Sequence, residues 1–99
     1  MVRKQGCVID TFVKNDNVVD RLVQEIRKCD PTSLADKVFH VTIKTPNAYT
    51  KFIMDGFTFT TDGNGNFASI ALEGTKTPEV HELRFLADQP EECVICFIY

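Results

Sequence analysis

FTFTTDGNGNFASIAL, residues 57–72, is the stretch that decides the predicted fold. It contains Asn64-Gly65, the strongest short-range signal for a two-residue type I′ turn, because both central residues of that turn need a positive φ. A turn there pairs the residues before it with those after it, so that Phe57 lies opposite Leu72. The sequence therefore predicts a β-hairpin, and the other elements can be arranged around it.

The residue types support this register of the hairpin. Cross-strand partners share a face, and a slip of one residue would mix apolar and polar side chains on both faces. The apolar face carries Phe57, Phe59, Ala68, Ile70 and Leu72, and the polar face carries Thr58, Thr60, Ser69 and Ala71. This division is typical of an antiparallel sheet that is covered on one side only.

Two elements are predicted before the hairpin, starting from the N-terminus. Residues 6–13, GCVIDTFV, are β-branched and aromatic and predict a strand. Apolar residues lie on both of its faces, which indicates an inner strand, and Asp10 is expected to be exposed or bonded to backbone. Asn17 is the predicted N-cap of an amphipathic helix over 17–29, whose apolar stripe packs on the sheet.

Residues 37–44, KVFHVTIK, predict the clearest strand, with Phe39, Val41 and Ile43 on one face and His40, Thr42 and Lys44 on the other. Thr45-Pro46 is a helix-start signal and Gly56 suits a position just past a helix end. These two signals predict a short helix over 46–55.

The C-terminal part is less clear. Residues 79–87, EVHELRFLA, fit a strand or a helix, and the strand is favoured because residues 88–92 then form a hairpin loop. Residues 93–99, CVICFIY, are apolar on both faces and predict a strand inside the fold.

These elements predict a single α+β domain over residues 1–99. Its core is a mostly antiparallel sheet of five to six strands with two helices, or three, packed on one face, in the order β-α-β-α-β-β-(β or α)-β. The first β-α-β unit is expected to be right-handed if its strands are parallel. A helix at 79–87 would favour a ferredoxin-like arrangement with an inserted hairpin.

Composition restricts the class of protein. The chain has 99 residues, 43% of them hydrophobic, and a net charge of −3, which argues against a general nucleic-acid binder. Residues 1–54 hold nine Lys/Arg and six Asp/Glu, a charge of +3, whereas residues 55–99 hold two and eight, a charge of −6. No signal peptide or membrane-spanning stretch is recognised, so the four cysteines are expected to be reduced thiols in the cytoplasm.

Two motifs resemble metal sites without meeting their requirements. Residues 62–67, DGNGNF, look like the middle of an EF-hand loop, but the acids needed at its ends fall on Thr60 and Ala71. The other register puts Phe67 where the loop needs Gly. Cys93-x-x-Cys96 lies in a predicted strand, so its two thiols point to opposite faces, which suits neither zinc nor a redox site. No metal and no cofactor are expected.

Catalytic chemistry is not predicted. His81 lies beside Glu79 and Glu82, but no nucleophile or glycine-rich phosphate loop stands at a telling spacing. The chain is therefore expected not to be an enzyme, with no catalytic residues. A small enzyme with an intersubunit site around His40 or His81 remains an alternative.

The polar face of the sheet is the candidate binding surface, made of His40, Thr42, Lys44, Thr58, Thr60 and Ser69. It lacks the aromatic and basic density that RNA binding on a sheet requires. The function favoured is a small protein-binding module of the inhibitor, immunity or adaptor type, whose partner is a protein, basic in character, or a second copy of the chain. A small-ligand or nucleotide sensor that dimerises through its sheet is the alternative. Neither nucleic acid nor membrane is an expected partner.

Overall fold

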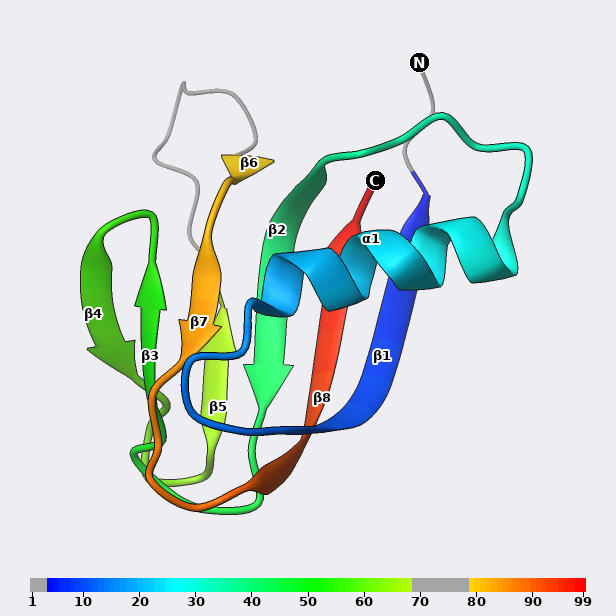
Figure 1. The fold of residues 1–99 in the computed structure, drawn as a ribbon. Helices are drawn as coiled ribbons and strands as arrows, with labels where there is room; N and C mark the ends of the chain where they lie inside the picture. Colours follow the sequence, from blue (N-terminus) through cyan, green and yellow to red (C-terminus); the bar gives the residue numbers. More distant parts are fainter. Residues whose placement is uncertain (1–3, 69–78) are drawn as a thin grey trace.

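The structure is a computed structural model that describes residues 4–68 and 79–99. These residues form two antiparallel sheets and one helix (Figure 1). The elements are β1 (Gln5–Phe12), α1 (Val18–Cys29), β2 (Val38–Lys44), β3 (Lys51–Met54), β4 (Phe57–Thr60), β5 (Asn66–Ala68), β6 (Glu79–Val80), β7 (Leu83–Phe85) and β8 (Glu91–Ile98). The predicted fold class, one sheet beneath two or three helices, is therefore wrong. The antiparallel pairing in a small domain is confirmed.

The larger sheet has the order β1-β8-β2-β5, and β6 also pairs with β2. Since β8 is antiparallel to both β1 and β2, these two strands run in the same direction with β8 between them. The connection from β1 through α1 to β2 is a right-handed crossover, as Figure 1 shows. This agrees with the handedness expected for such a unit.

The helix forms as predicted. The side chain of Asn17 accepts a hydrogen bond from the N–H of Val19 at 3.2 Å, and α1 follows it directly. Val18, Leu22 and Ile26 are buried against the sheets, and each such side chain contributes roughly 1.5–3 kcal/mol by leaving water. In the part of the chain that the structure describes, no helix is long and apolar enough to cross a membrane.

β1 is an edge strand, not the inner strand that its sequence predicted. Of the described strands it pairs only with β8. Val8 and Phe12 are buried on the helix side, whereas Ile9 on the opposite side is 68% exposed. Apolar residues on both faces thus do not distinguish an inner strand from an edge strand with an uncovered apolar face. β8, which includes most of residues 93–99, is the inner strand, as predicted.

The hairpin of the structure is not the predicted one. β4 pairs with β3, and Met54 of β3 is the partner of Phe57 of β4 across a two-residue turn. That turn is Asp55-Gly56, with positive φ values of 48° and 87°, as a type I′ turn requires. β5 pairs with β2 instead of β4. The smaller sheet is completed by β7 in the order β4-β3-β7.

The predicted type I′ turn at Asn64-Gly65 is wrong, because only Gly65 of the two has a positive φ, 80°. The chain turns over a longer loop from Asp62 to Asn66, which connects the two sheets. The N–H of Gly65 donates to the carbonyl of Asp62 at 3.0 Å, and the N–H of Asp62 donates to the carbonyl of Asn66 at 2.9 Å. The chain leaves the smaller sheet before this turn and enters the larger sheet after it. Phe57, predicted to be covered, is 79% exposed. Ile70, Ala71 and Leu72 of the predicted hairpin lie outside the described residues.

The predicted helix over 46–55 is absent from these residues. Thr45-Pro46 begins a turn, Tyr49 has a φ of 56°, and residues 51–54 form β3. Gly56, predicted to follow a helix end, is the second residue of the hairpin turn. Both roles need a positive φ, so Gly alone does not distinguish them.

Residues 79–87 are extended, as favoured, but they divide between the sheets. β6 joins the larger sheet through β2, and β7 joins the smaller sheet through β3. Phenylalanine rings pack within and between the sheets. Inside the smaller sheet, Phe52 meets its register partner Phe85 edge to face with centroids 5.5 Å apart. Between the sheets, the ring of Phe59 of β4 stacks on that of Phe67 of β5 with centroids 3.9 Å apart. The second contact joins the two sheets in one core.

Candidate functional site

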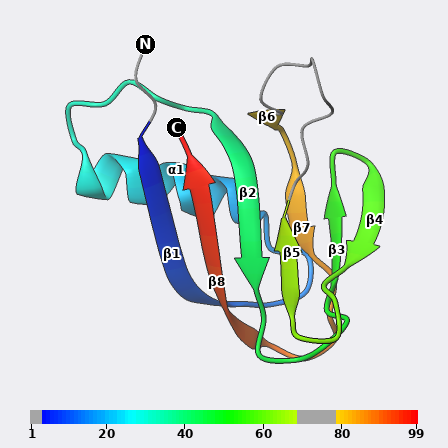
Figure 2. The same cartoon turned by 180° about the vertical axis from the view of Figure 1, so that it is seen from behind.

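The side of the larger sheet that faces away from α1 is the candidate site, and we call it the outer face. Figure 2 shows β1, β8, β2 and β5 in front with α1 behind them. No described helix or strand lies over this side. The pairing registers and strand alternation place on it the side chains of Gln5, Cys7, Ile9, Thr11, Thr42, Lys44, Asn66, Ala68, Glu92, Val94, Cys96 and Ile98.

The centre of the outer face is apolar. Ile9 and Val94 are direct cross-strand partners, and Ile9 is 68% exposed. Beside them, Cys7 of β1 is joined to Cys96 of β8 by a disulfide. Single exposed apolar residues are ordinary on protein surfaces, but contiguous ones indicate a contact surface.

A shallow groove of about 480 Å³ runs along this face. It is lined by Thr42, Ile43, Lys44, Asp62, Asn66, Phe67, Ala68, Val94 and Cys96. The groove thus combines an apolar floor with a cation and a carboxylate at its rim.

The loop at one end of the groove is held by Asp62. Its Oδ1 accepts the N–H of Asn66 at 2.9 Å and the N–H of Asn64 at 2.8 Å. These hydrogen bonds, with the nearby Lys44 ammonium, hold the pKa of the Asp62 carboxyl below its ordinary value of 3.8. Lys44 Nζ donates to the carbonyl of Asn64. The rim charges are therefore fixed to the loop.

The six predicted site residues do not form one surface. Thr42 and Lys44 lie on the outer face, as predicted. Half-buried His40 has a φ of 52° and lies where the pairing of β2 with β8 shifts register. Because of this bulge Val38 takes the buried place that alternation assigned to Phe39. Thr58 and Thr60 are exposed on β4 in the other sheet, and Ser69 lies outside the described residues.

The expectation of four reduced thiols is wrong for two of them. Cys7 and Cys96 are register partners on neighbouring strands, 89 residues apart in sequence, and they form a disulfide. The prediction that Cys93 and Cys96 point to opposite faces is confirmed. Cys93 is fully buried, and this burial raises the pKa of its thiol to about 12.

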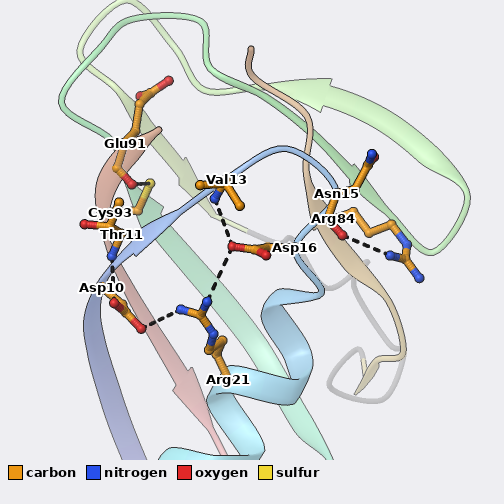
Figure 3. A network of polar contacts seen from close by, with 9 residues as sticks. All are labelled: Asp10, Thr11, Val13, Asn15, Asp16, Arg21, Arg84, Glu91 and Cys93. Carbon is orange, nitrogen blue, oxygen red and sulfur yellow. Dashed lines mark hydrogen bonds and ion pairs between the residues drawn. The ribbon is translucent and has the colours of Figure 1, made fainter. Parts of the chain in front are cut away.

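Figure 3 shows a network of polar contacts where β1 runs into α1. Arg21 Nη1 lies 2.5 Å from Asp10 Oδ2, and Arg21 Nη2 lies 3.5 Å from Asp16 Oδ2. The same carboxylates accept backbone N–H groups, Asp10 from Thr11 at 2.8 Å and Asp16 from Val13 at 2.9 Å. Asp10 is thus bonded to backbone, as predicted.

The titratable groups away from the outer face make structural contacts. His81 Nδ1 lies 2.8 Å from Glu79 Oε2 at an exposed position. The carboxylate of Asp55 accepts a hydrogen bond from the backbone N–H of His81. This bond connects the β3–β4 turn to the segment between β6 and β7. Buried Glu91 accepts a hydrogen bond from the hydroxyl of Thr50 at 2.8 Å. The Glu91–Thr50 contact joins a carboxylate to a hydroxyl, and both residues are buried.

No protein-family model matches this chain, and no curated protein matches it in sequence. The outer face is therefore the main guide to function. Its apolar residues Ile9 and Val94 were missed because both were expected to be buried. The alternation of Ile9 with Val8 in the sequence was the available signal, since it puts two apolar residues on opposite faces of one strand.

Proposed function

We propose that this chain is a small non-enzymatic protein-binding module, of the inhibitor, immunity or adaptor type, and that it contacts its partner through the outer face. The observation that supports this is the uncovered apolar centre around Ile9 and Val94. Covering contiguous apolar side chains with another protein removes them from water, which lowers the free energy of the complex. The rim charges Lys44 and Asp62 would orient the partner.

The partner is expected to carry basic residues. Residues 55–99 hold eight acids and two bases, and charge complementarity mainly raises association rate and specificity. The cytoplasm is the proposed place of action. The argument from four reduced thiols no longer supports it, since disulfides persist mainly in oxidising compartments and Cys7 is paired with Cys96.

The test is affinity capture from the native host at low salt, followed by mass spectrometry and measurement of the Kd for the captured protein. Val94→Asp and Ala68→Asp each place a charge on the outer face and should weaken binding about tenfold or more. Leu34→Asp is the matched control, because Leu34 is 95% exposed in the loop before β2. Equal Kd values for all three variants, or no captured protein, would refute the proposal.

A small-ligand sensor that dimerises through its sheet is the second candidate. The observation in its favour is the groove, since ligand sites commonly measure about 300–1,000 Å³. A screen of nucleotides and metabolites should then raise the melting temperature, and sedimentation should show a dimer. Without either effect this candidate is rejected.

A further inference from the structure

The N-terminal half of β1 presents an open strand edge. In an antiparallel pair, alternate residues exchange hydrogen bonds with the partner, and the residues between them point their N–H and C=O groups the other way. Lys4 and Tyr99 exchange both backbone hydrogen bonds at 2.8 Å. Even-numbered residues of β1 therefore bind β8, and the odd-numbered ones face the outer edge of the sheet.

The C-terminal half of this edge is closed by the network of Figure 3. The edge N–H of Thr11 is taken by Asp10, and that of Val13 is taken by Asp16, at 2.8 and 2.9 Å. Arg21 holds both carboxylates in place. Proteins often protect strand edges in such ways against pairing with other chains.

The remaining edge residues have no such protection. Among the described residues, no side chain or strand pairs with the edge groups of Gln5, Cys7 and Ile9. Three N–H and three C=O groups therefore line one side of a straight segment, in the pattern that an added strand matches. The edge itself thus specifies its ligand as an extended peptide.

A small pocket of about 150 Å³ lies beside this edge, between β1 and the C-terminal end of α1. Its walls are formed by Gln5, Gly6, Cys7, Glu25, Ile26, Cys29, Phe97 and Tyr99. Gly6 has no side chain, and the ring of Phe97 would be 2.9 Å from a Cβ there. A cavity of about this volume can hold a benzene-sized group, so one aliphatic side chain fits against Ile26 and Phe97.

Charged residues of both signs lie at this end of the edge. The last turn of α1 carries Arg27 and Lys28, which are exposed and form no ion pair with a described carboxylate. Glu25 lines the pocket and accepts a hydrogen bond from Cys29, and Lys4 is paired with Asp30 at 2.6 Å. Two cations without an ion pair against one such carboxylate favour an acidic segment, whereas the expectation of basic residues in the partner concerns the acidic residues of 55–99.

We propose that the edge from Gln5 to Ile9 binds an extended, acidic segment of a partner protein as an additional strand of the larger sheet, with one aliphatic side chain in the pocket beside Gly6. This proposal adds to the proposed function the way in which the partner attaches. It rests on the proposed function only because it requires a protein partner. Backbone hydrogen bonds supply the affinity and the pocket supplies the selectivity.

The first test selects random linear peptides displayed on phage against the oxidised protein. The selected peptides should share an aliphatic residue with acidic neighbours. Ile9→Pro removes an edge N–H without touching the bonds to β8, and it should weaken peptide binding about tenfold or more. Thr58→Pro is the matched control, since its N–H points outward from β4 at the edge of the smaller sheet. It should leave peptide binding unchanged.

The second test methylates the backbone nitrogen of a selected peptide at successive positions. Only every second N–H of an added strand points to β1, so affinity should fall at alternate positions. Leu34→Asp, in the exposed loop before β2, should leave peptide binding unchanged. Because the peptides are selected without any captured partner, a failure of this inference can be told apart from a failure of the proposed function.

Three results would overturn the proposal: no enriched peptides, equal effects of Ile9→Pro and Thr58→Pro, or a methylation profile without alternation. Self-association that Ile9→Pro abolishes would overturn it too, because the occupant would be a second copy. Circular dichroism checks that Ile9→Pro is folded. If that variant is unfolded, peptide binding is measured with the double variant Arg27→Glu and Lys28→Glu instead. This variant should weaken binding of the acidic peptides about tenfold. Unchanged binding would refute the proposal.

Discussion

Cys29 and Cys93 are the thiols outside the disulfide, and their surroundings predict opposite accessibility. Burial raises the pKa of Cys93 to about 12. A hydrogen bond from Cys29 Sγ to Glu25 Oε1, 3.0 Å long, raises the pKa of Cys29, but its side chain is exposed. Since the thiolate is the reactive form, both react slowly at neutral pH, and only Cys29 is within reach of a reagent.

An alkylating reagent should therefore label Cys29 in the native protein and Cys93 only after unfolding. Intact-mass spectrometry measures the labels, and the rate at Cys29 should rise with pH as its raised pKa is approached. The variant Cys29→Ser should remain unlabelled until denaturant is added. Rapid native labelling of Cys93 would contradict the buried position.

At the scale of elements, two turn signals compete for the same strand. Asp55-Gly56 precedes residues 57–60 and Asn64-Gly65 follows them, and either could close a hairpin with them. The sequence favours the second turn because Asn-Gly is the strongest short-range turn signal, and Gly56 then fits the end of a helix over 46–55. The stripe of Tyr49, Phe52 and Ile53 is short, and a short apolar run fits a helix or a strand equally well.

Gly65 is the position in these turns where a side chain is least tolerated. Its φ is 80°, and a Cβ there would lie 2.2 Å from the carbonyl oxygen of Thr45. Gly65→Ala should cost about 2 kcal/mol or more of unfolding free energy in urea, from backbone strain and displaced backbone.

Gly63→Ala is the control for this prediction. The nearest atom to its Cβ is the hydroxyl of Tyr49 at 3.2 Å, the end of an exposed side chain. Its cost should stay within about 0.5 kcal/mol. Equal costs at the two glycines would show that the turn does not press against Thr45.

At the scale of the whole molecule, the disulfide connects the first and last strands. Cys7 and Cys96 are 89 residues apart, so the bond restricts nearly the whole unfolded chain. The double variant Cys7→Ser and Cys96→Ser should lower the unfolding free energy by about 2–4 kcal/mol, measured by urea denaturation. Reductant should have the same effect on the wild type and none on the variant. Equal stability with and without reductant would contradict the bond.

The asymmetry of the larger sheet differs from the predicted one. One side is covered by α1 and the other is uncovered, but the uncovered side is apolar around Ile9 and Val94, whereas the hairpin pattern predicted a polar one. The outer face, however, comes from β1, β8, β2 and β5, which meet only through long-range pairing. Of the six predicted site residues, Thr42 and Lys44 were placed correctly, because β2 alternates regularly after its bulge.

The sequence by itself determined the elements whose signals are local. The cap at Asn17 and the apolar stripe after it define α1, and the continuous apolar residues of 93–99 mark a strand. Only the tertiary structure decided which strands pair: β4 with β3, Cys7 opposite Cys96, and β1 at the edge. The physical reason is that a local pattern fixes backbone conformation, whereas pairing depends on the competition of distant segments for one partner, which no single stretch of the chain encodes.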